Sequence, residues 1–258
     1  MLLAFDVGNT TIAIGLFRGR KLVRSWKIET DSDKTSDEYG VLLLSLMEAA
    51  GLAAGKITGA VISSVVPPLT PVIEDVCRST FGRTASVVGP GLKTGMPILY
   101  ENPLEVGADR ITASVAAFEK YGGPTIVLDF GTATTFDAIS AKGEYLGGAI
   151  APGVRISAEA LYLRTAKLPR IEIRKPKRAI GRTTVASMQS GLYFGYIGMV
   201  TRMIEEIRKE LGAEARVVAT GGFGGQLAAE LPVIEAYEPD LVLEGLRIIH
   251  DRNRDARD

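Results

Sequence analysis

One short motif occurs twice in this chain, and the spacing of its two copies is the strongest constraint on the fold. The segment FDVGNTT (residues 5–11) follows an apolar run, and LDFGTAT (residues 128–134) follows another. Asp6 and Asp129 lie 123 positions apart in a chain of 258 residues, and the glycine and the last threonine of each copy keep that offset. A strand, a turn and a further strand match at both places. The repeat therefore predicts two domains of one α/β design that face each other across a cleft.

The elements expected around the two motifs follow the same order in both halves of the chain. Each motif opens a set of three short strands, read from apolar runs separated by turn residues. Helical and strand-like segments then alternate. We expect strands at 2–7, 11–17, 21–28, 59–66, 85–89, 125–130, 134–140, 144–150 and 215–220, and helices at 37–52, 67–82, 102–122, 154–163, 184–211 and 239–252.

The residue types in the motif are suited to binding phosphate. An aspartate at the end of a buried strand faces the crevice where α/β proteins bind ligands. Gly8 permits a tight turn, and the donors of Asn9, Thr10 and Thr11 can surround phosphate oxygens. A carboxylate beside phosphate requires a cation between them, so Asp6 is expected to reach the Mg²⁺ of a nucleotide. An aspartate that caps its own turn is the alternative, and the recurrence of the motif argues against it.

Composition excludes several other classes of protein. Lysine plus arginine and aspartate plus glutamate both number 30, so no overall charge attracts nucleic acid or anionic lipid. The basic run at residues 170–178, which proline interrupts, is interpreted as a solvated loop. A single cysteine, Cys77, and a single histidine, His250, exclude a His/Cys zinc cluster and argue against nucleophilic catalysis with histidine. No secretion signal is visible, and the apolar stretch 191–200 is too short to span a membrane. We expect a cytoplasmic protein that binds neither nucleic acid nor membrane.

Two glycine-rich segments resemble nucleotide-binding motifs without matching them. GPGLKTG (residues 89–95) has leucine where a P-loop requires glycine before its lysine. TGGFGG (residues 220–225) follows a predicted strand but lacks the Rossmann spacing. Its glycines are expected to let the backbone approach an adenosine, or to form a plain turn between a strand and a helix.

Several motifs together resemble the type III pantothenate kinase family. DVGNT and DFGTATT look like the nucleotide-binding turns of the acetate and sugar kinase, Hsp70 and actin superfamily. NPLEVGADR (residues 102–110), GGAIAPG (147–153) and GRTTVASMQSGLYFG (181–195) are similar to this one family within it. The resemblance implies an α/β fold of two duplicated actin-like (ribonuclease H-like) domains, with mixed sheets flanked by helices and an interdomain cleft. We place the N-terminal half at residues 1–103 and the C-terminal half, with a dimerisation helix, at residues 104–258.

The resemblance also implies a reaction and a set of residues. Members transfer the γ-phosphoryl group of ATP to the primary hydroxyl of pantothenate, giving 4'-phosphopantothenate in the first step towards coenzyme A. Asp109 would be the catalytic base, and Asp129 would bind a monovalent cation, K⁺ or NH₄⁺, while Asp6 would reach Mg²⁺. The ATP-binding residues would be Asp6, Val7, Gly8, Asn9, Thr10, Thr11, Ile12, Ala13 and Thr132, and the pantothenate-binding residues Tyr100, Gly107, Ala108, Asp109, Arg110 and Thr184.

Elementary chemistry supports two of these roles. Phosphoryl transfer requires a carboxylate that accepts the hydroxyl proton, and Asp109 stands near a predicted helix start beside Arg110. The helix dipole and the guanidinium would there favour the ionised form of Asp109. Arg110 could hold the substrate carboxylate, or form a surface salt bridge instead.

The long helix at 184–211 also indicates assembly. Gly191, Gly195 and Gly198 fall on one helical face, where small residues permit close approach of another helix. Tight packing inside one chain would explain them equally well. The family is dimeric, with the residue matching Thr184 reaching the partner's pocket, so we expect a homodimer.

Two other functions remain open from the sequence. A kinase of a sugar or another hydroxy acid would keep Asp6 and Asp129 but would not need GADR at residues 107–110. A nucleotide-dependent regulator of the chaperone or actin kind would use ATP to move domains, although 258 residues leave little room for the insertions that such proteins carry.

Overall fold

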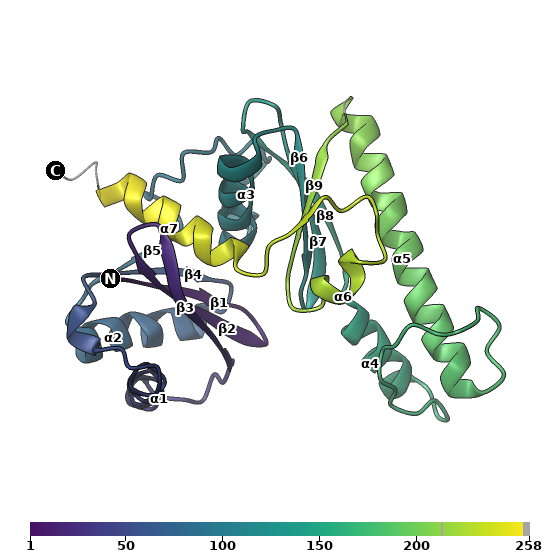
Figure 1. Ribbon diagram of the computed structural model, residues 1–258, viewed down its shortest axis with the longest axis horizontal. Coiled ribbons are helices and arrows are strands. Elements are labelled where there is room, and N and C mark those ends of the chain that lie inside the picture. The colour runs from purple at the N-terminus through teal and green to yellow at the C-terminus, as the bar shows by residue number, and fades with distance from the viewer. Residues whose placement is uncertain (213, 255–258) are drawn as a thin grey trace. The chain divides into compact units, whose positions relative to one another are not determined.

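The computed structural model describes residues 1–212 and 214–254, which form two compact units (Figure 1). Unit 1 contains residues 1–96, 100–119 and the chain from residue 240 onward. Unit 2 contains residues 97–99 and 120–239. Each unit is built around one five-stranded sheet.

The two sheets have the same topology. In unit 1 the order is β3-β2-β1-β4-β5, and in unit 2 the order β10-β9-β6-β7-β8 is the same pattern read from the other edge. In both, the first strand is antiparallel to the second and parallel to the fourth. This equivalence confirms the duplication predicted from the repeat. The strands are β1 (Leu2–Val7), β2 (Thr11–Arg18), β3 (Lys21–Glu29), β4 (Gly59–Ser64), β5 (Ala85–Val87), β6 (Thr125–Phe130), β7 (Ala133–Ile139), β8 (Tyr145–Pro152), β9 (Arg216–Thr220) and β10 (Ala236–Tyr237).

The helices begin and end where local signals direct them. In α1, Thr35 and Glu38 form a reciprocal capping box, and α2 and α5 end at Gly82 and Gly212, both left-handed. The predicted helix at 102–122 is divided into a 3₁₀ turn and α3. The helices are α1 (Ser36–Ala49), α2 (Thr70–Phe81), α3 (Ala108–Tyr121), α4 (Val154–Arg164), α5 (Thr184–Leu211), α6 (Gly224–Ala228) and α7 (Leu241–Arg254), with 3₁₀ turns η1 (Ala54–Lys56), η2 (Pro67–Leu69) and η3 (Pro103–Glu105).

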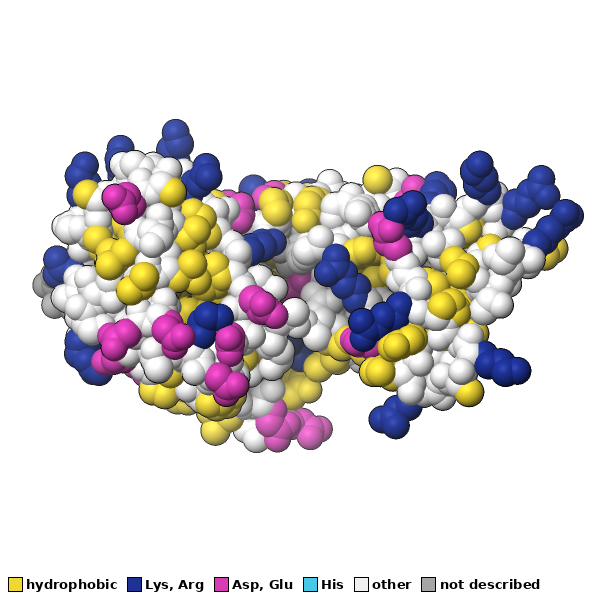
Figure 2. Space-filling model, turned by 90° about the horizontal axis from the view of Figure 1, so that it is seen from below, with side chains coloured by type: hydrophobic (Ala, Val, Ile, Leu, Met, Phe, Trp, Pro, Cys, Tyr) yellow, Lys and Arg dark blue, Asp and Glu magenta, His cyan; other side chains and the backbone are white. Residues whose placement is uncertain are grey.

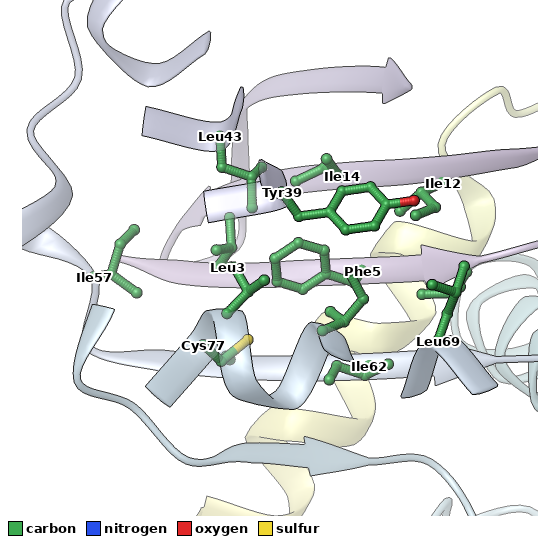
Figure 3. Packing of buried hydrophobic residues seen from close by; sticks show 14 of the residues in the cluster. Leu3, Phe5, Ile12, Ile14, Tyr39, Leu43, Ile57, Ile62, Leu69 and Cys77 are labelled. Atoms are coloured by element: carbon green, nitrogen blue, oxygen red, sulfur yellow. The ribbon is translucent and has the colours of Figure 1, made fainter. Parts of the chain in front are cut away.

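The core of unit 1 lies between its sheet and the helices α1 and α2 (Figure 3). Leu3 and Phe5 of β1 alternate with residues of the other face and are fully buried. Tyr39 packs against them from α1, and its hydroxyl donates to the Asp31 carbonyl at 2.9 Å. This core fixes the end of β1, where the first motif begins.

The core of unit 2 is the counterpart on the second sheet. Leu128 and Phe130 of β6 pack with Phe136 of β7 and with residues of the long helix α5, among them Tyr196 and Val200. Burial of these side chains fixes the end of β6, where the second motif begins.

The last helix, α7, returns to the first sheet. It packs against β1, β2 and β4, and the backbone at Gly245 lies so close to that of Thr112 in α3 that a Cβ would overlap the Thr112 carbonyl. The compact units therefore differ from the sequence halves 1–103 and 104–258, because α3 and α7 both pack in unit 1. Among the residues that the structure describes, no helix is both long and apolar enough to span a membrane.

Candidate active site

The first motif forms a tight turn between β1 and β2 that is tied to the end of β3. The Gly8 N–H donates to the Thr11 carbonyl at 3.1 Å, and the Gly8 carbonyl accepts from Thr30 Oγ1 at 2.6 Å. The Thr30 N–H donates to the Thr10 carbonyl at 3.1 Å. Asn9, Thr10 and Thr11 are exposed at the tip of this turn. The turn thus presents amide and hydroxyl groups on a fixed backbone.

Asp6 stands one residue from the end of β1, half-buried between its register partners Ala13 of β2 and Ser63 of β4. The side chains of Val7 and Ile12, both predicted to hold ATP, are fully buried in the core of unit 1. Their part is therefore limited to packing beneath the turn and to backbone contacts.

Asp109 lies in the first turn of α3. Its Oδ1 accepts the N–H of Arg110 at 2.8 Å, which orients the carboxylate at the helix start. Gly107 lies directly against it: a Cβ at residue 107 would be 2.5 Å from Asp109 Oδ1 and 3.5 Å from Val65 Cγ1. The absence of a side chain at Gly107 therefore leaves the space that the carboxylate occupies.

Burial controls the ionisation of Asp109. Desolvation raises the pKa of its carboxyl group, while the Arg110 N–H and the Arg110 guanidinium both lower it by a smaller amount. The expectation that Arg110 and the helix start would favour the ionised form is wrong in its net direction, because the sequence does not reveal how deeply the carboxyl is buried. A raised pKa makes the carboxylate a stronger base.

Val65 connects the turn to the start of α3. Its N–H donates to the Val7 carbonyl at 3.0 Å, and its side chain borders Gly107. The predicted ATP turn and the predicted segment GADR therefore meet at the carboxyl ends of β1 and β4. The sequence did not single out Val65, which lay inside the strand predicted at 59–66 and in the structure directly follows β4.

The remaining predicted substrate residues are distributed over both units. Ala108 and Arg110 are half-buried in the first turn of α3, and Tyr100 is half-buried before η3. Thr184 is exposed at the first position of α5, after the N-cap Thr183. The structure brings Tyr100, Gly107, Ala108, Asp109 and Arg110 into unit 1, whereas Thr184 belongs to unit 2.

The second motif repeats the turn in unit 2. The Gly131 N–H donates to the Ala133 carbonyl at 3.1 Å, and exposed Thr132 accepts the Gly153 N–H through its carbonyl at 3.1 Å. Half-buried Asp129 pairs with Thr135 of β7 and Thr220 of β9. The two carboxylates thus have equivalent positions in their own sheets.

Two glycines border the carboxylate of Asp129. Gly221 has a φ of +90°, and a Cβ there would overlap Asp129 Oδ1 and the Phe130 backbone. A Cβ at Gly131 would lie 3.5 Å from the same oxygen. The TGGFGG segment therefore lies beside the aspartate of the second motif, which sequence reasoning did not anticipate.

A cavity of about 420 Å³ opens in unit 2 next to that segment. This volume is in the range of pockets that bind small molecules. The Arg155 guanidinium lies over the Phe223 ring, 5.9 Å from the ring centroid, and both residues line the cavity. Residues 170–173 of the basic run line the cavity, and residues 170–178 form no helix or strand and are mostly exposed. The lining residues are Arg155, Ala158, Glu159, Arg170, Ile171, Glu172, Ile173, Phe223 and Gln226.

The described side chains set limits on metal binding. No group of three or more His, Cys, Asp or Glu side chains in residues 1–212 and 214–254 could hold a metal ion by itself. Mg²⁺ in kinases takes one or two carboxylates together with substrate phosphates, which is compatible with a single carboxylate at Asp6. At Asp129, the Gly221 backbone packs directly against the carboxylate, because a Cβ there would overlap Asp129 Oδ1 and the Phe130 backbone.

Solved structures share this fold along nearly the whole chain. A Baf-family transcriptional activator from Campylobacter jejuni matches with a TM-score of 0.60 at 18% identity, covering 98% of this chain and 99% of the other. An inorganic polyphosphate/ATP-glucomannokinase from Arthrobacter sp. strain KM matches with a TM-score of 0.51 at 15% identity, covering 97% and 98%. At these identities the likeness shows the fold alone, and it confirms the predicted pair of duplicated actin-like domains.

Sequence comparison identifies the family. The model of type III pantothenate kinase matches residues 2–206. The type III pantothenate kinase of Moorella thermoacetica is 54% identical over 253 residues, covering 98% of this chain and all of that relative. The enzyme of the same name from Geobacter sulfurreducens is 53% identical over 255 residues, covering 99% and 100%. The chain therefore belongs to the type III pantothenate kinase family, and it phosphorylates pantothenate with ATP in coenzyme A biosynthesis.

Proposed function

We propose that Asp109 is the general base of this reaction. The carboxylate would remove the proton from the primary hydroxyl of pantothenate as its oxygen attacks the γ-phosphorus of ATP. The bond from that phosphorus to the β–γ bridging oxygen breaks, leaving ADP and 4'-phosphopantothenate. The observation that supports this role is the half-buried carboxylate, held by the Arg110 N–H and given room by Gly107 beside the ATP turn.

The two substrates bind on either side of Val65 in this proposal. The turn from Asp6 to Ala13 holds the phosphates through the backbone and the exposed hydroxyls, and the family resemblance adds Thr132 to the ATP-binding residues. Arg110 pairs with the carboxylate of pantothenate, for which a guanidinium is suited. Tyr100, Gly107, Ala108 and Thr184 complete the set that the family resemblance implies.

Two cations support the phosphates. Mg²⁺ held at Asp6, and K⁺ or NH₄⁺ held at Asp129, would neutralise charge that develops on the transferred group.

The adenosine of ATP would enter the cavity beside Phe223, since the cavity wall combines an aromatic ring and two isoleucines with polar groups. We place the reaction in the cytoplasm, where ATP is available.

The cation role predicts a dependence on potassium. ADP release with Mg-ATP is expected to require pantothenate. It should be about ten-fold faster in potassium than in sodium buffer, which corresponds to a bound ion that lowers the activation barrier by about 1.4 kcal/mol. In Asp129→Asn this difference should shrink to less than about two-fold. A coupled assay of initial rates in the two buffers measures both effects.

The same assay separates the alternatives. ADP release without any need for pantothenate would contradict the kinase assignment and favour a nucleotide-dependent regulator. Turnover with pantothenate that is equal in sodium and potassium would contradict only the role of Asp129. Asp33→Asn is a control, since this exposed aspartate has none of the roles proposed above.

We also propose that α5 forms a homodimer interface. Gly191, Gly195 and Gly198 are exposed, and a Cβ at any of them would meet nothing within 4 Å in this chain. Packing within the protomer therefore does not account for these glycines. Hydrophobic side chains are also exposed among Lys and Arg in the part of unit 2 at the right of Figure 2. Of the exposed large hydrophobic residues, Leu163, Ile180, Val185 and Phe194 lie on or near α4 and α5.

Alanine at Gly191 and Gly195 should stabilise the protomer but weaken its association into a dimer. Gly191→Ala with Gly195→Ala is expected to stabilise the isolated helix by about 0.5–1 kcal/mol per site. If two helices approach closely there, the same methyl groups weaken association, by about ten-fold in Kd for a loss of about 1.4 kcal/mol. Sedimentation velocity over a dilution series measures the Kd. Unchanged association in the double variant would exclude this face as the interface.

A further inference from the structure

Tyr237 contacts the turn that leads into α6 and the first residues of that helix (residues 221–225, called the glycine loop below) with both its hydroxyl and its ring. The hydroxyl donates to the Gly221 carbonyl at 2.9 Å. A Cβ on Gly224 would lie 2.5 Å from Tyr237 Cε2, and one on Gly225 would lie 3.3 Å from Cε1. The loop can therefore rest on the ring only because glycine occupies both positions.

The backbone around Tyr237 is itself fixed to the sheet. Tyr237 pairs with Ala219 of β9, and the Glu238 N–H donates to the Ala219 carbonyl at 2.8 Å. On the other side, the Phe223 N–H donates to the Phe130 carbonyl at 3.3 Å, and the Gly224 N–H donates to the Gly221 carbonyl at 3.1 Å. The glycine loop is therefore held between the ends of β6 and β10.

Gly221 is also the residue of this loop that lies against Asp129. Its φ of +90° turns the backbone so that its Cα faces Asp129 Oδ1, and its carbonyl accepts the Tyr237 hydroxyl. Phe223 and Gln226, two and five residues later, line the cavity of unit 2. One hydroxyl thus anchors a short segment that borders both the carboxylate and the cavity.

We propose that Tyr237 is a positioning residue for ATP and the monovalent cation. Its hydroxyl fixes Gly221, and through Gly221 it fixes the space beside Asp129 and the Phe223 wall of the cavity. Tyr237 touches no reacting atom in this arrangement. The inference rests on the proposed roles of Asp129 and the cavity, and it adds a residue outside every motif of the family resemblance.

Tyr237→Phe tests the proposal because it removes the hydroxyl and keeps the ring beneath Gly224 and Gly225. Loss of one hydrogen bond of about 1 kcal/mol corresponds to about a five-fold change. The KM for ATP and the potassium concentration for half-maximal activity should each rise about five-fold. The KM for pantothenate and kcat should change less than about two-fold, because the residues proposed for those functions lie mainly in unit 1. Calorimetric titration with a non-hydrolysable ATP analogue should show the same weakening without turnover.

Tyr121→Phe is the matched control. This tyrosine is also in unit 2, and its hydroxyl donates to Glu238 rather than to the glycine loop. It should leave both KM values and the potassium dependence unchanged. Three results would overturn the proposal. They are unaltered ATP binding in Tyr237→Phe, an equal rise in the KM values for ATP and pantothenate in Tyr237→Phe, and the same shift of ATP affinity in Tyr121→Phe. The variant Asp129→Asn separates two kinds of failure. If neither Asp129→Asn nor Tyr237→Phe changes the potassium dependence, the proposed role of Asp129 is wrong. If Asp129→Asn changes the potassium dependence and Tyr237→Phe does not, only the proposed role of Tyr237 is wrong.

Discussion

Asp109→Asn is expected to lower kcat by about 10³-fold while the protein remains folded. Removal of a positioned general base typically reduces a rate by about 10²- to 10⁴-fold. Asparagine keeps an oxygen that can accept the Arg110 N–H, which Asp109 Oδ1 accepts at 2.8 Å, so the start of α3 should not change. Single-turnover rates with saturating ATP and pantothenate isolate the chemical step. The KM for pantothenate should change far less than kcat, since the amide occupies the same space.

The same substitution should stabilise the protein in a pH-dependent way. Burial raises the pKa of Asp109 in the folded state above its ordinary value of 3.8. Below the pKa that the carboxyl group has in the unfolded state, the group is protonated in both states and does not oppose folding. As pH rises from that pKa through the higher pKa of the folded state, the free energy of unfolding falls, and above the folded-state pKa this loss of stability stays constant. The free energy of unfolding of Asp109→Asn should therefore exceed that of the wild type at neutral pH, with the difference vanishing at low pH.

Activity and stability together distinguish a base from a structural aspartate. Asp37→Asn is a useful control, because Asp37 also stands in the first turn of a helix in unit 1 but is exposed. It should leave kcat unchanged. If Asp109→Asn unfolds more easily than the wild type at neutral pH, the half-buried carboxylate has a stabilising partner and the raised pKa is refuted. If its kcat falls less than about ten-fold, another group accepts the proton.

The sequence was sufficient to predict nine of the ten strands in the described residues because each of the nine carries its own signal, whereas the two-residue strand β10 was not predicted. Apolar runs ending in Asp6 and Asp129 became β1 and β6 with the expected bounds, and the long helix was correctly placed at 184–211. Local periodicity and glycine stops decide such elements. The family and the reaction followed from motifs at fixed spacing, which likewise need no knowledge of tertiary contacts.

Features that depend on contacts between distant segments could not be predicted. The return of α7 to the first sheet depends on packing against β1, which no local pattern shows. The net direction of the Asp109 pKa depends on burial, and burial competes with the local effect of Arg110 that the sequence does show. In the same way, the contact of Gly221 with Asp129 joins residues 92 positions apart along the chain. Glycines in a turn motif are visible in a sequence, but the side chain that they make room for is not.

Gly107→Ala is expected to lower kcat by about 10²-fold through its neighbour Asp109. The new Cβ would lie 2.5 Å from Asp109 Oδ1, closer than real contacts permit, so the carboxylate must move. Misplacement of a reacting group by about 1 Å can reduce a rate by about 10²-fold. The backbone at Gly107 has no positive φ, so alanine is not strained there and the effect is confined to the contact. Steady-state rates should show a loss in kcat, and the acid limb of the pH profile should shift because the displaced carboxyl has a different environment.

Gly55→Ala is the matched control for this prediction. Gly55 is also in unit 1, has no positive φ, and a Cβ there would meet nothing within 4 Å. It should leave kcat and the pH profile as in the wild type. The double variant Gly107→Ala with Asp109→Asn should be no slower than Asp109→Asn alone, because the methyl group acts only by displacing the base. If the two losses multiply instead, Gly107 contributes to the reaction independently of Asp109, and the space beside the carboxylate is not the reason for glycine at this position.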